Sequence, residues 1–89
     1  MIFITLFRLK KKPTKAMIAE NNKLMEKWAK EGDWKLLGFY WTLGRYDLVC
    51  VAELKDEKRA MKLAIQLGDI ASSETLVAVP REEAIKFVE

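Results

Sequence analysis

Alternation of apolar and polar residues predicts four strands and two long helices. Strand segments are rich in Ile, Val and aromatic residues, whereas helical segments repeat apolar residues every three or four positions. In the order strand, helix, strand, strand, helix, strand, the predicted ranges are 2–9, 14–31, 34–43, 46–54, 56–68 and 74–79. This β-α-β-β-α-β order predicts one α+β domain over residues 1–89, with the ferredoxin-like arrangement of four antiparallel strands.

Helix boundaries have clear chemical signals. Gly32 is a natural helix stop because it tolerates a left-handed conformation, and Asp56 is suited to cap the second helix. Gly68 is expected to end that helix, whose predicted apolar stripe is Ala60, Met61, Ala64, Ile65 and Leu67. A short C-terminal helix is expected after Pro80, with three residues facing inward: Ala84, Phe87 and Val88.

A tight turn at Gly44-Arg45 joins two aromatic-rich strands and predicts a β-hairpin. If the loop holds two or four residues, alternation places one wholly apolar set on the face that the helices cover. That set is Leu37, Phe39, Trp41, Leu48, Cys50 and Ala52. The core is also expected to hold the three tryptophans, Trp28, Trp34 and Trp41.

The second face of the hairpin is mixed, with Tyr40 opposite Val49, Thr42 opposite Asp47 and Leu36 opposite Glu53. The first strand is expected to add Phe3, Thr5 and Phe7 to this face. An exposed apolar face of several hundred Å² is rare in soluble monomers. The sequence therefore predicts a homodimer or higher oligomer, in which two sheets pack face to face as a dimeric α/β barrel with an interface of roughly 2,000 Å² or more.

Gly44, Tyr46 and Asp47 of the turn resemble the signature that gives the GYD-domain family its name. The run Tyr40–Val49 is similar to its strand–turn–strand, and 63–68 followed by 73–78 is similar to its second helix and last strand. The resemblance implies a small stand-alone domain with a ferredoxin-like, dimeric-barrel fold. A more distant similarity is to the ligand-sensing domain of leucine-responsive regulators, which binds amino acids at subunit interfaces. Because this chain lacks their DNA-binding helix-turn-helix, the shared fold does not transfer their function.

Charge and cysteine content bear on nucleic-acid binding and on the cellular location of the protein. The net charge is +3, from 16 Lys and Arg against 13 Asp and Glu, which is too small to indicate nucleic-acid binding. The basic cluster within Arg8–Lys15 is typical of a solvated loop that leads into a helix, and a phosphate-binding patch is the alternative. Cys50 is the one cysteine, so no internal disulfide is possible and a cytoplasmic location is expected. Its place in a predicted strand indicates that it packs as a small buried hydrophobic residue. The apolar run Met1–Phe7 is too short to span a membrane, and its positive charges follow it rather than precede it as in a signal peptide.

Common catalytic constellations are missing from the sequence. The chain has no His, one Cys and no phosphate-binding glycine loop, so we expect no catalytic residue, no metal and no cofactor. Asp47 and Glu53 lie six strand residues, roughly 20 Å, apart, and cannot form a carboxylate pair within one subunit. A non-catalytic protein is therefore favoured over an enzyme.

A pocket at the hairpin end is the predicted ligand site, at or near the subunit interface. Its candidate residues are Asp47, Tyr46, Thr42, Tyr40, Arg45 and Glu53. Each has a structural alternative: Asp47 as a turn residue, the tyrosines as packing groups, and Glu53 as the partner of a Lys or Arg in the other subunit.

Three functions stay open at this point. The first is a small-molecule-binding homo-oligomer. The others are a cofactor-free oxygenase or isomerase of the dimeric-barrel type, and a structural or protein-interaction module.

Overall fold

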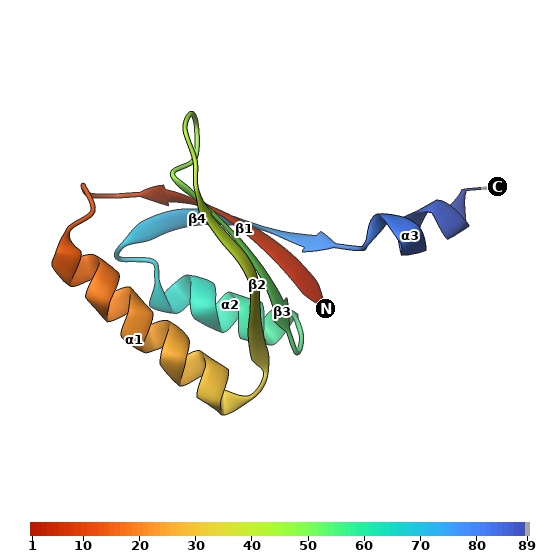
Figure 1. Cartoon of the computed structure of the whole chain (residues 1–89), viewed down its shortest axis with the longest axis horizontal. Coiled ribbons are helices and arrows are strands. Elements are labelled where there is room, and N and C mark those ends of the chain that lie inside the picture. Colours follow the sequence, from red (N-terminus) through yellow and green to blue (C-terminus); the bar gives the residue numbers. More distant parts are fainter. Residues whose placement is uncertain (89) are drawn as a thin grey trace.

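The computed structural model describes residues 1–88, which form a twisted antiparallel sheet with two helices on one side (Figure 1). The elements in chain order are β1 (Ile2–Leu9), α1 (Lys15–Glu31), β2 (Trp34–Trp41), β3 (Leu48–Leu54), α2 (Glu57–Gln66), β4 (Ala71–Ala78), α3 (Arg81–Ala84) and the 3₁₀ turn η1 (Ile85–Phe87). The strand order is β2-β3-β1-β4, which confirms the α+β, ferredoxin-like prediction.

Capping residues mark the start of both long helices and the end of α1. The Thr14 side chain accepts a hydrogen bond from the Met17 amide, and Asp56 accepts one from the Arg59 amide, as its position before α2 predicted. Gly32 closes α1 with a φ of 86°, which side chains with a Cβ rarely adopt. In residues 1–88, no helix combines the length and the apolar character needed to cross a membrane.

The core lies between the sheet and the two helices. Its buried members are Phe3 of β1, Leu54 of β3, Trp28 of α1 and Leu63 of α2, and Phe3 is only 2% exposed. The Trp28 and Trp34 rings meet edge to face with their centroids 5.8 Å apart. Truncating one such aromatic side chain to Ala typically costs about 3–5 kcal/mol, so these rings hold the two layers together.

The face predicted for the β1 side chains was wrong. Phe3 lies opposite Ala52 of β3, and both are buried in the helix-covered layer. Because side chains alternate along a strand, Thr5 and Phe7 share that face with Phe3. Both alternating sets of β1 are largely apolar, so the pattern alone could not show which set the helices cover.

A β-bulge between Leu36 and Gly38 changes the predicted pairing at the start of β2. Leu36 lies opposite Ala52 instead of Glu53, and Lys35 takes the position opposite Glu53. The extra residue, Leu37, is 47% exposed, although the sequence placed it under the helices. A bulge leaves no pattern in the residue order here, since both Leu36 and Leu37 are apolar.

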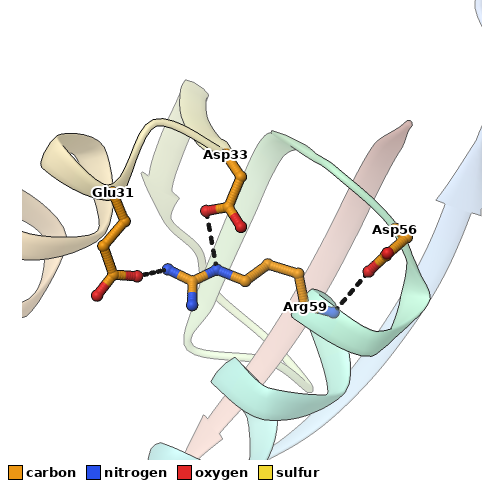
Figure 2. A network of polar contacts seen from close by, with 4 residues as sticks. All are labelled: Glu31, Asp33, Asp56 and Arg59. Atoms are coloured by element: carbon orange, nitrogen blue, oxygen red, sulfur yellow. Dashed lines mark hydrogen bonds and ion pairs between the residues drawn. The ribbon is translucent and has the colours of Figure 1, made fainter.

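Three further burial predictions were wrong. Met61 and Ile65 of α2 are exposed, and Arg59 and Leu63 are the buried residues of this helix. The long Arg59 side chain lies inward, where it contacts the carboxylates of Glu31 and Asp33 (Figure 2). Trp41, at the end of β2, is 59% exposed.

The second side of the sheet, called here the open face, lies away from α1 and α2 (Figure 1). Successive side chains along a strand point to opposite faces, so the residues that alternate with the helix-facing ones lie on the open face. Its apolar members are Ile2, Ile4, Leu6, Val49, Val51 and Leu76, flanked by Tyr40 of β2.

The C-terminal segment does not fold back onto the domain, so the predicted inward orientation of Phe87 and Val88 was wrong. Both are more than three-quarters exposed, and α3 projects beyond the edge of the sheet (Figure 1). The radius of gyration of 14.1 Å exceeds the ~12 Å expected for a compact chain of this length.

Arg59 joins the two helices through carboxylates at the end of α1 (Figure 2). Its Nη2 donates to Glu31, and its Nε lies 3.2 Å from an Asp33 oxygen in an ion pair that lacks hydrogen-bond geometry. The Arg59 side chain is 7% exposed, whereas the two carboxylates are about one-third exposed. These carboxylates therefore compensate the charge of the buried guanidinium.

We expect Arg59→Ala to lower the free energy of unfolding by about 2 kcal/mol, because it removes a buried charged hydrogen-bonding group and leaves Asp33 without its cation. Urea denaturation followed by tryptophan fluorescence measures the change. Lys62→Ala, at an exposed position of the same helix, is the matched control and should change stability by less than ~0.5 kcal/mol. Equal effects of the two substitutions would contradict the role of Arg59.

Candidate functional site in a helix-side cavity

A cavity of about 300 Å³ lies between α1, the sheet and the segment that joins α2 to β4; it is called here the helix-side cavity. Its walls are formed by Phe7, Leu9, Pro13, Met17, Ile18, Asn21, Asn22, Met25, Phe39, Trp41, Leu48, Leu67, Ile70 and Ala71. A volume of ~150 Å³ takes up one benzene ring, so this cavity has room for roughly two aromatic rings.

The chemistry of the lining is almost wholly apolar. None of these described lining residues carries a titratable side chain, and the polar side chains among them are the amides of Asn21 and Asn22. A smaller space of about 60 Å³ extends toward the core, and it shares with the helix-side cavity Phe7, Asn21, Met25, Phe39 and Leu67. An uncharged, mainly apolar molecule with a polar group for the amides matches this lining.

Cys50 lies beside the smaller space and is half-buried, as a small hydrophobe would be. Burial raises the pKa of its thiol to about 11. The thiol is therefore neutral near pH 7, and it does not have the lowered pKa that a nucleophilic cysteine needs.

Asp47 fixes one wall of the helix-side cavity. Its Oδ2 accepts a hydrogen bond from the Leu9 amide at 2.7 Å, and its own amide donates to the Phe7 carbonyl at 2.8 Å. Phe7 and Leu9 both line the cavity. The structure thus places Asp47 behind the wall. Its carboxylate accepts from an amide of β1 and not from the nearby turn amides that the structural alternative predicted.

Thr42 and Tyr46 are held within the same hairpin. The Thr42 hydroxyl donates to the Tyr46 carbonyl at 2.6 Å, and the Thr42 amide donates to the Asp47 carbonyl at 2.9 Å. Gly44 has a φ of 103° at the tip, a conformation that requires glycine. Arg45 is exposed beside it, with its guanidinium carbon 6.0 Å from the centre of the Tyr46 ring.

The Tyr46 side chain connects the hairpin to the far edge of the sheet. Its hydroxyl donates to a carboxylate oxygen of Glu74 in β4 at 2.6 Å. This hydrogen bond, helped by the negative charge of Glu74, raises the pKa of Tyr46 above its ordinary value. Glu74 lies opposite Leu6, so the pair lies on the open-face side.

Tyr40 and Glu53 occupy other parts of the open face. The Tyr40 ring lies across Gly38, where a Cβ would come within 2.9 Å of its hydroxyl oxygen. Glu53 is exposed beside Lys35, at the end of β3 away from the hairpin. The six predicted residues therefore do not converge on one pocket, and their role in ligand binding stays a prediction.

Asn21 is the lining residue that sequence reasoning missed as a functional candidate. The sequence does contain a signal, because this amide lies at a helical spacing between Met17 and Met25, where a core-facing stripe would otherwise be apolar. Asn21 is partly buried and lines both spaces. A polar residue in an apolar stripe is thus the feature that points to the site.

The fold and the cavity define a small ferredoxin-like α+β protein with an apolar site beneath one helix. The family model of the GYD domain matches residues 3–88, and the chain belongs to this family. No curated protein and no solved structure matches the chain. Within residues 1–88, no group of three or more Cys, Asp or Glu side chains is placed to hold a metal ion.

We expect the Tyr46–Glu74 hydrogen bond to appear in a pH titration of tyrosine absorbance. In a Tyr40→Phe background, Tyr46 is the one remaining tyrosine, and its midpoint should lie above the usual ~10. Glu74→Gln should lower that midpoint, because it removes the charged acceptor. A midpoint that Glu74→Gln leaves unchanged would show that the hydrogen bond does not form in solution.

The sign for stability follows from the raised pKa. Below pH ~10 Tyr46 is neutral in both states, and the full stabilisation by the hydrogen bond is present. As the pH rises above ~10, the unfolded tyrosine loses its proton first and the stabilisation decreases. Tyr46→Phe should abolish this part of the pH dependence.

Proposed function

We propose that this GYD-domain protein is a cytoplasmic homodimer that binds a small, mainly apolar molecule in the helix-side cavity of each subunit. The observation that carries the ligand part is the lining itself, which joins apolar walls to the amides of Asn21 and Asn22. The uncharged lining favours binding over acid–base catalysis, which needs a titratable group near the substrate. A lone cysteine with a free thiol is consistent with a cytoplasmic location.

The open face supports the dimer. Ile4, Val51 and Leu76 lie side by side across three strands of this face, with neither α1 nor α2 over them (Figure 1). Burying such a face against an identical one removes apolar surface from water on both subunits. In that dimer Tyr40, Tyr46 and Glu53 of the predicted ligand set would line the space between the sheets.

The hairpin connects the two parts of the proposal. Asp47 holds the cavity wall through Leu9, while the adjacent Tyr46 reaches Glu74 on the open-face side. We therefore assign Asp47 a positioning role rather than a direct contact with the ligand. Its neighbour Thr42 keeps the hairpin closed through the Tyr46 carbonyl.

A charge placed on the open face should break the dimer. Light scattering of the native chain should give a mass of twice 10.3 kDa, and Ile4→Lys should give the mass of one chain. The desolvation of an unpaired ammonium group opposes burial of the face. Met61→Lys, on the exposed side of α2, is the control and should remain dimeric. A native chain that is monomeric at micromolar concentration would rule the dimer out.

A bulky substitution in the lining of the helix-side cavity tests whether a ligand binds there. Isothermal titration with 2-naphthol as the probe measures binding. We expect Ile18→Trp to raise the dissociation constant for 2-naphthol by about tenfold or more, because the new indole, added to that of Trp41, fills part of the cavity. Ala19→Trp adds the same side chain on the exposed neighbouring position of α1 and should leave binding unchanged. Equal effects of both substitutions, or no binding by the native chain, would count against the cavity.

A further inference from the structure

Residues 10–15, which lead from β1 into α1, are called here the basic segment. They carry four lysines: Lys10, Lys11, Lys12 and Lys15. Residues 1–19 contain no Asp or Glu. Within residues 1–88 the ion pairs are those of Arg59, so none of the four lysines is paired with a carboxylate of that range. The basic segment is therefore a concentration of positive charge that the proposed function does not yet use.

The basic segment lies at the mouth of the helix-side cavity. Leu9, directly before it, and Pro13, within it, both line the cavity. Pro13 and Ile18 are exposed members of the lining, so the cavity opens to solvent beside them. Lys15 precedes Ile18 by three residues, a spacing at which side chains are neighbours on a helix surface. Because lysine carries its charge on a flexible four-carbon stem, these ammonium groups can reach the rim of the opening.

Two hydrogen bonds hold the start of the basic segment against the opposite wall of the cavity. The Lys10 amide donates to the Ile70 carbonyl at 2.9 Å, and the Lys10 ammonium group donates to the Gly68 carbonyl. Ile70 lines the cavity. Figure 1 shows the connection from β1 to α1 beside the connection from α2 to β4. The basic segment is thus fixed at one end, and its other three lysines are exposed.

Nearby carboxylates do not cancel this charge. Asp69 is exposed between Gly68 and Ile70, next to the carbonyl groups that Lys10 contacts. Asp47 lies behind the wall, where its carboxylate accepts from the Leu9 amide. Two carboxylates therefore face four lysines, and the mouth of the cavity keeps a net positive charge. A net positive charge beside an apolar cavity attracts an anion to its opening.

We propose that the ligand of the helix-side cavity is an amphipathic anion. Its apolar body, of up to about two aromatic rings, fills the cavity, and one anionic group such as a carboxylate lies at the basic segment. The lining has no titratable side chain to pair with a charge, whereas at the exposed rim the anionic group stays hydrated. This inference rests on the proposed function and names the chemical class of its ligand.

Isothermal titration with two probes of the same shape tests the proposal. The native chain should bind 2-naphthoate about fivefold more tightly than neutral 2-naphthamide at low salt, the size expected for ion pairs at an exposed site, and the preference should shrink at high salt. Lys11→Gln/Lys12→Gln should abolish the preference and leave binding of 2-naphthol unchanged. Lys23→Gln/Lys27→Gln is the matched control, because it removes the same charge from exposed positions of α1 that do not line the cavity. This control should keep the preference.

Other results would overturn the proposal. If 2-naphthol binds but 2-naphthoate binds no more tightly than 2-naphthamide, the anion is wrong and the apolar site stands. Equal losses of preference in the two Gln double variants would show an effect of overall charge alone. Binding of 2-naphthoate that Ile18→Trp leaves unchanged would place the anion outside the cavity.

Two further outcomes concern the site as a whole. A native chain that co-sediments with phosphatidylserine vesicles but does not bind 2-naphthoate would assign the lysines to a lipid surface and overturn the proposal. A native chain that binds neither 2-naphthol nor 2-naphthoate would overturn both the anion and the proposed ligand site.

Discussion

The structure depends on one constraint: a single sheet with two apolar faces has helices on only one of them. Phe3, Trp28 and Leu63 form the layer between sheet and helices, and that layer is a normal core. The same strands point Ile4 and Val51 to the other side. Because these strands carry apolar side chains on both sides, the open face presents an apolar surface that neither α1 nor α2 covers.

The family signature at the hairpin has a structural explanation. Gly44 permits the tip, Asp47 joins the hairpin to β1 through the Leu9 amide, and Tyr46 joins it to Glu74 of β4. Three strands are thus tied together at one end of the sheet by charged or short hydrogen bonds. The helix-side cavity lies beneath this end, so the signature positions the wall of the site without lining it.

Much of the fold could be predicted from the sequence, since period, caps and turn residues agree with one another. The candidate site could not, because it forms where α1 meets strands that are distant in the sequence. Asn21 was visible only as a polar residue in an apolar stripe. The errors in the predicted burial arise where contacts between distant segments decide the outcome. β1 is apolar on both faces, the bulge at Leu37 leaves no pattern in the sequence, and buried Arg59 pairs with two carboxylates from outside its own helix.

The central claim is that the open face packs against its counterpart in a second copy. Isotope-filtered nuclear Overhauser spectroscopy on a mixture of labelled and unlabelled chains measures this contact directly. We expect cross-peaks between chains from the methyl groups of Ile4, Val51 and Leu76 on the open face. Cross-peaks between chains that arise only from α1 and α2, or none at all, would contradict the account.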